Sequence, residues 1–487
     1  MKKKWRFDVI ISIGLVLHFV YSCKSGTNSV STRGGTDKTP KGDDSSGGKV
    51  EIQAPEVQSD SSVLPSEANV QDPPVGTSDL PRSTKDPVKS GSETNGINYQ
   101  DSSTAIAKLK SYLQSDTWSL DGIVGSDFSR IALAKSDAQD AINLIWSRYA
   151  ETSRRERSQE ISQGMIALKS KVLKFKTRNF GKEPADGHSL YISMHGGGSA
   201  PASTNDSQWE NQINLYSPSE GIYLAPRAPI DAWNMWFIPE IDPLFDRLIS
   251  DYVIAEGVNP NRVYLIGYSA GGDGVYQLGT RSADRWAAAT MCAGHPNDAS
   301  PLNLRNLPFA VYSGANDSEF NRNAMAKDWL SKMDDLNKND PSGYIHTGEV
   351  FAGLGHWMNG KEAVAIPWMA GFTRNPFPGR VVFRQTPVPR SSFYWISVDP
   401  DSFKPGSELD IQYERQKFTF NRFTKGGDIV IRLSDRMVDL DMPVEIVSAN
   451  RSHFKGTPKR TIEVIAKTIK ERSDPSFVFT SEIKVAI

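Results

Sequence analysis

The chain has 487 residues and a formal net charge of −1 at pH 7, with 56 Lys and Arg against 57 Asp and Glu. That balance argues against a broad nucleic-acid surface, which needs an excess of basic residues to displace counterions. Two cysteines, Cys23 and Cys292, are too few for a disulfide framework or a cysteine-based zinc site. No nucleotide-binding or zinc-protease motif is present either, so we expect no cofactor and no metal.

The N-terminus has the pattern of an export signal. Basic residues at 2–4 precede a short apolar stretch at 9–20, which suits a signal peptide better than a membrane span. The stretch ends in Val20-Tyr21-Ser22-Cys23, which looks like a bacterial lipobox with Tyr in place of a smaller residue. We predict a lipoprotein-type signal over residues 1–23 and a cell-envelope protein held on a membrane by lipidated Cys23. An uncleaved anchor, or an ordinary signal peptide with a periplasmic or secreted product, remains the alternative.

The next segment, residues 24–100, is rich in Ser, Gly and Pro and contains one aromatic residue, Tyr99. It cannot bury enough apolar surface to offset its ordering entropy, so we predict a disordered linker. Residues 101–164 then show helical spacing, with Ser136–Gln139 as a candidate capping box. We expect a helical extension there.

From 165 to 378, short apolar runs alternate with helical patterns, which predicts an α/β sheet with helices on both faces. The run Arg262–Gly267 is almost wholly apolar, as expected of a parallel strand covered on both faces. Other strands are expected at Leu168–Lys176, Leu190–Met194, Gly221–Pro226, Ala287–Cys292, Phe309–Ser313 and Thr347–Phe351.

Residues 379–487 have a different pattern and predict a small, mostly β C-terminal domain with one helix, Thr461–Arg472. Its strands are expected at Val381–Arg384, Phe393–Val398, Leu409–Glu414, Asp428–Leu433, Val444–Val447 and Ser481–Ile487.

The strongest chemical signal is Gly267-Tyr268-Ser269-Ala270-Gly271, which is Gly-x-Ser-x-Gly directly after an apolar strand and before a helical pattern. Glycines at these positions permit a sharp turn that exposes a serine hydroxyl above the sheet edge. The backbone N–H of the next residue, Ala270, can then stabilise a developing oxyanion. We predict Ser269 as a nucleophile.

A serine nucleophile needs a base and an acid that orients the base. His356 lies in the loop after the last predicted parallel strand, where this topology supplies its base. His295 is interpreted as a hydrogen-bonded loop histidine. Asp317, after the strand Phe309–Ser313, is the predicted acid, with Glu319 and Asp298 as weaker candidates.

His195-Gly196-Gly197-Gly198 follows an earlier strand and can expose backbone N–H groups without side-chain obstruction. We assign one oxyanion donor to Gly197 or Gly198 and the other to Ala270.

Aromatic residues crowd the same predicted edge. Tyr268, Trp233, Trp236 and Trp357 are candidates for a substrate-binding cleft, with ordinary packing under loops as the alternative.

These motifs resemble the α/β-hydrolase superfamily, and more narrowly the poly(3-hydroxybutyrate) depolymerase and feruloyl-esterase-like exported bacterial hydrolases. The segments that carry the resemblance are Met194–Gly198, Asn259–Tyr264, Gly267–Gly272 and Gly355–Trp357. The resemblance implies an α/β-hydrolase fold and the hydrolysis of an ester by a serine hydrolase, with polymer- or glycan-linked esters among the expected substrates. A serine peptidase of the same fold is one alternative. The other is an inert hydrolase whose β domain attaches to a polymer or the envelope.

Overall fold

The structure, a computed structural model, describes residues 99–487 except 425, 450 and 487. The predicted signal segment, Cys23 and nearly all of the predicted linker lie outside the described residues. None of the helices in the described part is long and apolar enough to cross a membrane.

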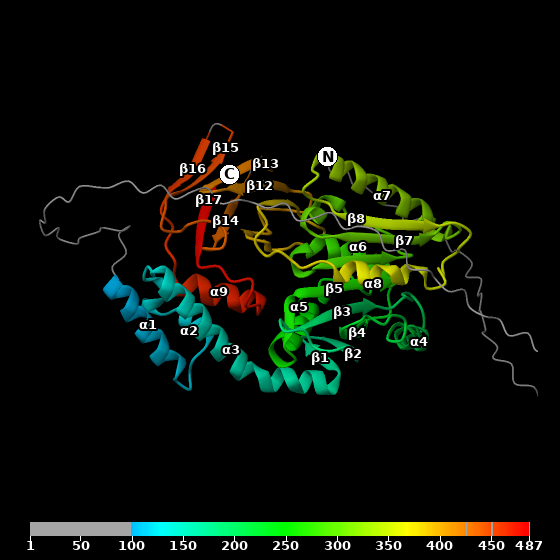
Figure 1. Cartoon of the computed structure of the whole chain (residues 1–487), viewed down its shortest axis with the longest axis horizontal. Helices are drawn as coiled ribbons and strands as arrows, with labels where there is room; N and C mark the ends of the chain where they lie inside the picture. The colour runs from blue at the N-terminus through cyan, green and yellow to red at the C-terminus, as the bar shows by residue number, and fades with distance from the viewer. Residues whose placement is uncertain (1–98, 425, 450, 487) are drawn as a thin grey trace, which may run out of the picture. The chain divides into compact units, whose positions relative to one another are not determined.

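The centre of the fold is one eight-stranded sheet with the order β1-β2-β4-β3-β5-β6-β7-β8 (Figure 1). Strands β4, β3, β5, β6, β7 and β8 are parallel, while β2 pairs antiparallel with β1 and β4. The strands are β1 (Met165–Leu168), β2 (Lys171–Phe180), β3 (His188–Met194), β4 (Gly221–Arg227), β5 (Val258–Tyr268), β6 (Ala288–Cys292), β7 (Phe309–Gly314) and β8 (His346–Phe351). The predicted α/β sheet is therefore confirmed.

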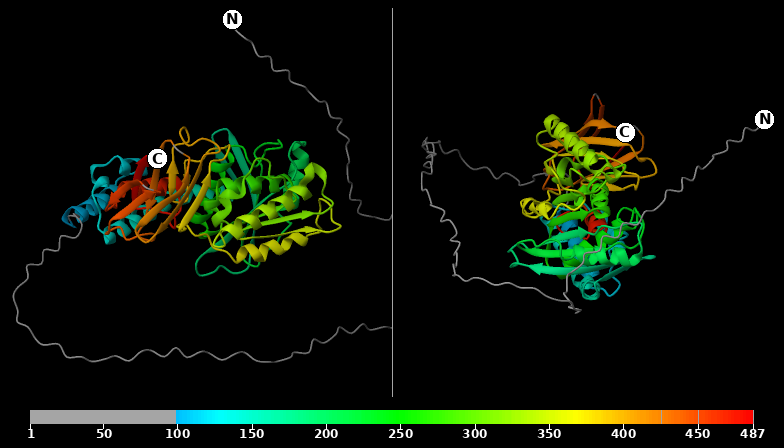
Figure 2. Two further views of the ribbon diagram at one scale, coloured as in Figure 1. Left: turned by 90° about the horizontal axis from the view of Figure 1, so that it is seen from above. Right: turned by 90° about the vertical axis from the view of Figure 1, so that its right-hand side faces the viewer.

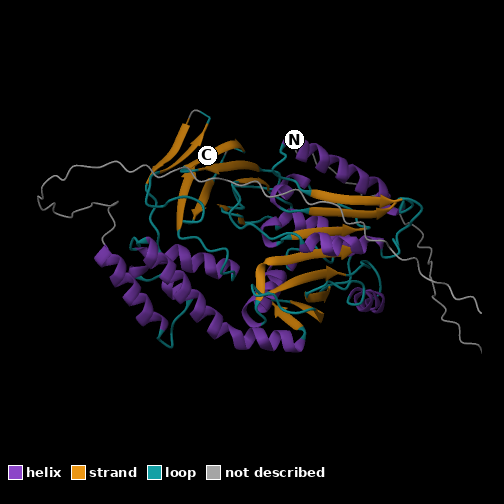
Figure 3. Ribbon diagram, in the orientation of Figure 1, coloured by secondary structure: helices purple, strands orange, loops and turns teal. Residues whose placement is uncertain are grey.

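Alternating side chains on the strands build a separate apolar core on each face of the sheet. In β3, Leu190 and Ile192 contribute to one core and Tyr191 to the other. Helices accordingly cover both faces (Figure 3). Residues of α5, α6 and α7 line the first core. The second core is lined by α8 and by residues at the C-terminal end of α4. These helices are α4 (Ala202–Gln212), α5 (Ile241–Ala255), α6 (Ala270–Arg281), α7 (Arg322–Asn339) and α8 (Ala365–Ala370).

The C-terminal region forms two further sheets, with orders β10-β11-β14-β17 and β16-β15-β13-β12-β9. Its elements are β9 (Arg380–Arg384), β10 (Ser392–Phe393), β11 (Ile396–Val398), β12 (Glu408–Glu414), β13 (Lys417–Phe423), β14 (Asp428–Leu433), β15 (Val444–Ser448), β16 (Arg451–Gly456), α9 (Ile462–Arg472) and β17 (Ser481–Ala486). The mostly β character of this region is as predicted.

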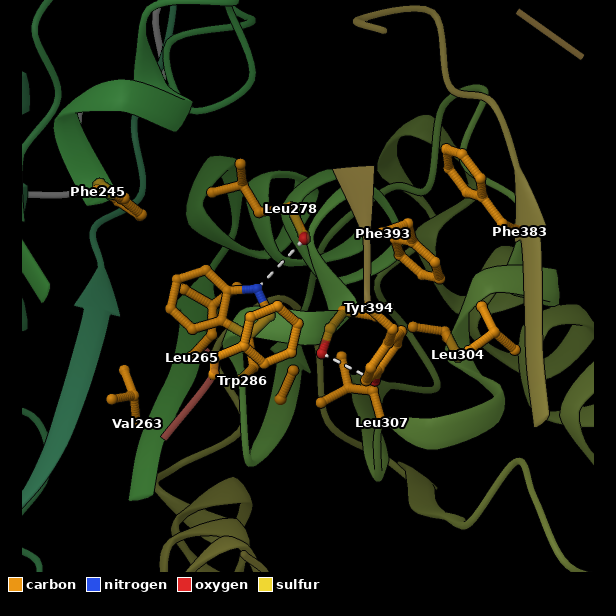
Figure 4. Packing of buried hydrophobic residues seen from close by; sticks show 14 of the residues in the cluster. Phe245, Val263, Leu265, Leu278, Trp286, Leu304, Leu307, Phe383, Phe393 and Tyr394 are labelled. Atoms are coloured by element: carbon orange, nitrogen blue, oxygen red, sulfur yellow. Dashed lines mark hydrogen bonds between the residues drawn. The ribbon is translucent and has the colours of Figure 1, made fainter. Parts of the chain in front are cut away.

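Apolar packing joins these sheets to the first core. Phe383 of β9 stacks on Phe393 at 4.7 Å between ring centroids, and the next residue, Tyr394, donates a hydrogen bond to the Ala283 carbonyl. Figure 4 shows these residues beside Trp286, whose indole N–H bonds to the Leu278 carbonyl. The C-terminal sheets thus share the core that lies under α6.

The helical extension consists of α1 (Tyr99–Leu113), α2 (Leu120–Val124) and α3 (Lys135–Gln163). Its apolar side chains share a third core with Ile462, Ile465 and Ile469 of α9, so the two ends of the described chain pack together (Figures 1 and 2). The far end of α3 reaches α5, where Arg247 bonds to Glu160 at 2.8 Å.

The structure corrects several local predictions. Ser136 caps nothing, because α3 begins one residue earlier and its N-terminal Ala134 N–H is bonded by Ser102 of α1 instead. The predicted strand Leu168–Lys176 starts too early, because Lys169 has a φ of 53° and turns the chain between the end of β1 at Leu168 and the start of β2 at Lys171. A positive φ at Tyr394 likewise divides the predicted strand Phe393–Val398 into β10 and β11. The half-exposed strands β13 and β16 were not predicted.

Candidate active site

The candidate residues follow strands that end at one edge of the sheet. His195 follows β3, Ser269 follows β5, Asp317 lies three residues after β7, and His356 lies in the loop after β8. These four strands are parallel, so their carboxyl ends meet at this edge. Crevices outside the carboxyl ends of parallel strands are where open α/β sheets bind ligands.

Ser269 occupies the sharp turn between β5 and α6, with φ 58° and ψ −121°. A non-glycine residue in this conformation is strained, and the surrounding bonds hold it: the Ser269 N–H donates to the Cys292 carbonyl at 2.9 Å. The turn also requires Gly271, because a Cβ there would lie 2.1 Å from the Met194 carbonyl oxygen. The result is a serine hydroxyl held above the end of β5.

Hydrogen bonds connect this serine to a histidine and an aspartate. His356 Nε2 lies 3.0 Å from Ser269 Oγ, and His356 Nδ1 lies 2.9 Å from Asp317 Oδ2. Asp317 is 3% exposed, and the second carboxylate oxygen lies 3.5 Å from Arg322 Nη1. The arrangement is an acid, an imidazole and a hydroxyl in series.

The other candidate acids and the other candidate histidine are paired, in the part of the chain that the structure describes, with residues other than His356 and Ser269. Glu319 is largely exposed and pairs with Arg322 at 3.8 Å. The Asp298 carboxylate accepts a hydrogen bond from Gln277 at 2.8 Å. His295 Nδ1 accepts the Asn297 N–H at 2.9 Å, which makes it the hydrogen-bonded loop histidine that the sequence suggested.

Tyr268 supports the histidine loop. Its hydroxyl donates to the His356 carbonyl at 2.7 Å and accepts the Met358 N–H at 3.1 Å. Burial raises the pKa of this phenol above its ordinary value, so it stays a neutral donor. Tyr268 is 8% exposed, and its hydrogen bonds position the base.

The glycine run offers one of its two candidate amides. Gly198 donates its N–H to Asn205 Oδ1 at 3.0 Å, so that N–H is turned away from a substrate. The assignment of Gly198 as a donor therefore does not fit, and Gly197 is the remaining candidate in the run. Ala270 begins α6, so its N–H has no acceptor within the helix.

His195 is buried and supports the glycine run. Its Nε2 accepts the Ala228 N–H at 3.1 Å and its Nδ1 lies 2.6 Å from the Gly196 carbonyl, which fits a neutral imidazole protonated on Nδ1. Burial lowers the pKa of His195 to about 4, with Arg227 acting in the same direction and Asp231 and Asp206 against it.

The buried state of His195 makes stability depend on pH. As the pH falls from about 6.5 to about 4, the unfolded chain takes up a proton at this position that the folded chain refuses. The free energy of unfolding should fall over that window by up to about 3 kcal/mol from this group. Urea unfolding of the wild type and of His195→Gln at pH 7 and pH 4.5 measures it. A loss of equal size in both proteins would assign the pH dependence to other groups.

The aromatic candidates divide by exposure. Trp233 is 58% and Trp357 is 53% exposed, and a Cβ on Gly198 would lie 3.6 Å from the Trp233 Cα. The assignment of Trp236 to a substrate cleft is wrong, because its side chain has no exposed surface and its indole N–H donates to the His195 carbonyl at 2.8 Å.

Sequence analysis missed several residues of this site. Phe320, three positions after Asp317, is 66% exposed and has a positive φ of 53°. Asn205 bonds to Gly198 of the glycine run, and Asp231 bonds to Asn205. No sequence signal identified Asn205 or Asp231, because Asn205 lies on a polar helix and Asp231 comes from the loop after β4.

No cluster of three or more His, Cys, Asp or Glu side chains that could hold a metal ion occurs among the described residues. The Cys292 thiol is fully buried, and burial raises its pKa well above the ordinary value.

No protein-family model matches the chain, and no curated protein matches it. Solved structures do match part of it. Esterase PE8 is 19% identical over 40% of this chain and 99% of its own, with a TM-score of 0.29. LpqC, a poly(3-hydroxybutyrate) depolymerase from Bordetella parapertussis, is 17% identical over 42% of this chain and 86% of its own, with a TM-score of 0.32. A phospholipase/carboxylesterase from Dyadobacter fermentans is 17% identical over 42% of this chain and 99% of its own, with a TM-score of 0.29.

The fold follows from the topology of the chain itself. A mostly parallel eight-stranded sheet has helices on both faces, and a strained serine turn joins its central strand β5 to α6. The part of this protein that contains the eight-stranded sheet has the α/β-hydrolase fold.

Proposed function

We propose that the protein is a serine hydrolase that cleaves carboxylic esters through an acyl-enzyme. The observation that carries the proposal is the series of hydrogen bonds from Asp317 through His356 to Ser269, with 2.9 and 3.0 Å between the paired atoms. Ser269 is half-buried, and its strained backbone holds the hydroxyl at the start of a helix, beside backbone donors. The same groups would also serve a serine peptidase, so the experiment below compares the two substrate classes.

In the proposed reaction, His356 Nε2 takes the proton of Ser269 Oγ as that oxygen bonds to the ester carbonyl carbon. The carbonyl oxygen becomes an oxyanion held by the N–H groups of Ala270 and Gly197. When the intermediate collapses, the ester C–O bond breaks and the leaving alcohol takes the proton from His356. Water then attacks the acyl-enzyme by the same steps and releases the acid. Asp317 accepts the hydrogen bond from His356 Nδ1 and so holds the imidazole in the tautomer that can accept the serine proton.

Exposed aromatic rings favour a substrate that extends beyond the reacting ester. Trp233, Phe320 and Trp357 are three of the seven exposed large hydrophobic side chains among the described residues. Trp233 lies beside Gly198 in space, and Phe320 and Trp357 closely follow the acid and the base in sequence. Large rings of this kind bind apolar chains or sugar rings, which is consistent with an ester linked to a polymer or glycan. Tyr268 is largely covered and serves the histidine loop instead.

We propose further that the enzyme is exported and held on the cell envelope by lipidated Cys23. The support is the sequence alone: the basic start, the short apolar stretch and Val20–Cys23. Mass spectrometry of the mature N-terminus tests it, since cleavage before Cys23 with an added diacylglycerol is expected. An unmodified Cys23 would rule out the lipid anchor.

The catalytic proposal is tested with the full chain and a fluorophosphonate probe. We expect a single adduct on the peptide that contains Ser269, together with turnover of a short-chain nitrophenyl ester and little turnover of the matching anilide. Comparable turnover of the anilide would favour the peptidase. A folded protein that neither labels nor turns over an ester would reject the proposal and favour a binding role.

A further inference from the structure

Asn205 lies behind the glycine run, on α4, and is completely buried. Its side-chain amide bonds twice to one residue: Oδ1 accepts the Gly198 N–H at 3.0 Å, and Nδ2 donates to the Gly198 carbonyl at 3.0 Å. The amide thus grips both polar groups of Gly198. A Cβ on Gly197 would lie 2.0 Å from Asn205 Oδ1, so a glycine is required at that position for this contact.

The orientation of this amide is set by Asp231. Asn205 Nδ2 also donates to Asp231 Oδ1 at 2.7 Å. A carboxylate can only accept, so it must face the NH₂ end of the amide, and the oxygen end is then directed at the Gly198 N–H. The hydrogen-bonding pattern allows one orientation of the Asn205 side chain.

Arg227 in turn holds Asp231 ionised and in place. Arg227 is 9% exposed, and its Nη2 lies 2.6 Å from Asp231 Oδ1, while its Nε lies 2.7 Å from Asp206 Oδ1. Burial acts to raise the pKa of Asp231, but the hydrogen bonds from Arg227 and Asn205 outweigh it and the pKa lies below its ordinary value. The ionised Asp231 carboxylate, held by Arg227, thereby fixes the side-chain amide of Asn205.

The consequence concerns the backbone torsions of Gly197 and Gly198, which set the direction of the Gly197 N–H. Both glycines have a positive φ, 113° and 114°. Glycine populates this region without strain and can also adopt other conformations, so these torsions are not fixed by the glycines themselves. A run of three glycines has no side chains to hold its backbone, so a fixed donor direction needs an external contact. Asn205 supplies that contact through both polar groups of Gly198.

We propose that Asn205 is a positioning residue, which holds the 197–198 backbone so that the Gly197 N–H faces the developing oxyanion. The inference rests on the proposed function, because an oxyanion forms only if Ser269 attacks a carbonyl. Asn205 touches neither substrate nor the reacting atoms. Its contribution is expected in kcat, since the oxyanion contact strengthens as the transition state forms.

The experiment exchanges the donor and acceptor of the Asn205–Asp231 pair in the full chain. Asn205→Asp places an acceptor against the Asp231 carboxylate and the Gly198 carbonyl, with no donor between them. The double variant Asn205→Asp with Asp231→Asn restores one donor to that contact and leaves an acceptor for the Gly198 N–H. Asn205→Leu, which keeps the shape and removes all hydrogen bonding, is the matched control.

At pH 8 we expect Asn205→Asp and Asn205→Leu each to lower kcat for a nitrophenyl ester by about 10²-fold, with KM changed less than about threefold. The double exchange should recover at least about tenfold of the kcat lost by Asn205→Asp, whereas Asp231→Asn should not rescue Asn205→Leu. Hydrogen exchange of the peptide that contains Gly196–Gly198 should speed up in Asn205→Asp and slow again in the exchange variant. The melting temperature of every variant confirms that it is folded at the assay temperature.

The outcomes separate the two proposals. An inactive, unlabelled wild type overturns the proposed function and this inference with it. An active wild type together with a folded Asn205→Asp of normal kcat overturns the inference alone. A loss confined to KM, or a double exchange no better than Asn205→Asp, also overturns it, because a purely structural or substrate-binding role predicts those results.

Discussion

Replacement of Ser269 by Ala is expected to lower kcat for ester hydrolysis by about 10⁴–10⁶-fold and to abolish fluorophosphonate labelling. The reason is that the remaining amides can still bind an oxyanion but no longer meet a nucleophile. The backbone should tolerate the change, since the φ of 58° at this position strains serine and alanine alike. Steady-state kinetics and the melting temperature of the purified variant measure both effects.

His356→Ala should cause a loss of similar size, because the two side chains act as a unit. The matched control is His295→Ala, which removes a histidine from the loop after the neighbouring strand β6. His295 bonds only within its own loop through its ring, so its removal should change kcat by less than about threefold. Ser269→Ala that still labels, or His295→Ala that abolishes turnover, would assign the chemistry to other residues.

Asp317→Asn is expected to lower kcat by about 10⁴-fold while the protein stays folded. Arg322 can only donate, and its Nη1 lies 3.5 Å from Asp317 Oδ1, so it should attract the oxygen of the new amide. The NH₂ group then faces His356 Nδ1 and favours the tautomer that carries its proton on Nε2. That tautomer cannot accept the proton of Ser269 Oγ.

The matched control is Glu319→Gln, which neutralises the nearby exposed carboxylate on the same loop. Because Glu319 is largely exposed and its contact with Arg322 is 3.8 Å, we expect kcat to stay within about twofold of the wild type. Comparing pH profiles of kcat/KM for both variants checks the assignment. If Glu319→Gln were the variant with the large loss, the acid of this site would have to be reassigned.

Local patterns located much of this site. Gly267–Gly271 directly follows an apolar strand, and His356 and Asp317 each follow a strand farther along the sheet. Such strand–loop patterns predict which side chains come together, because the carboxyl ends of parallel strands lie at the same edge of a sheet. The structure brings Ser269, His356 and Asp317 together there. Glu319 pairs with Arg322 instead, and Asp298 accepts a hydrogen bond from Gln277.

The sequence could not predict the direction in which a backbone N–H or a loop side chain points. Gly198 and Gly197 are indistinguishable in the sequence, and only the position of Asn205 on α4 shows that the Gly198 N–H is occupied. Trp233 and Trp236 lie three residues apart, yet one is exposed and the other is completely buried beside His195. Short loops without a repeat give no periodicity from which to infer the direction of a side chain.

The sequence by itself determined the alternation of strands and helices, the serine turn and the loops that carry an acid and a base. It could do so because apolar periodicity and glycine-rich turns are local properties of the chain. Tertiary structure alone decided the partners of each polar group: Ser102 at the start of α3, Tyr268 on the histidine loop, and Asn205 on the glycine run. Ser102 and Tyr268 are distant in the sequence from the groups they bond, whereas Asn205 lies seven residues from Gly198 and meets it only because α4 folds back over the glycine run. Burial away from water is what forces each of these groups to be paired.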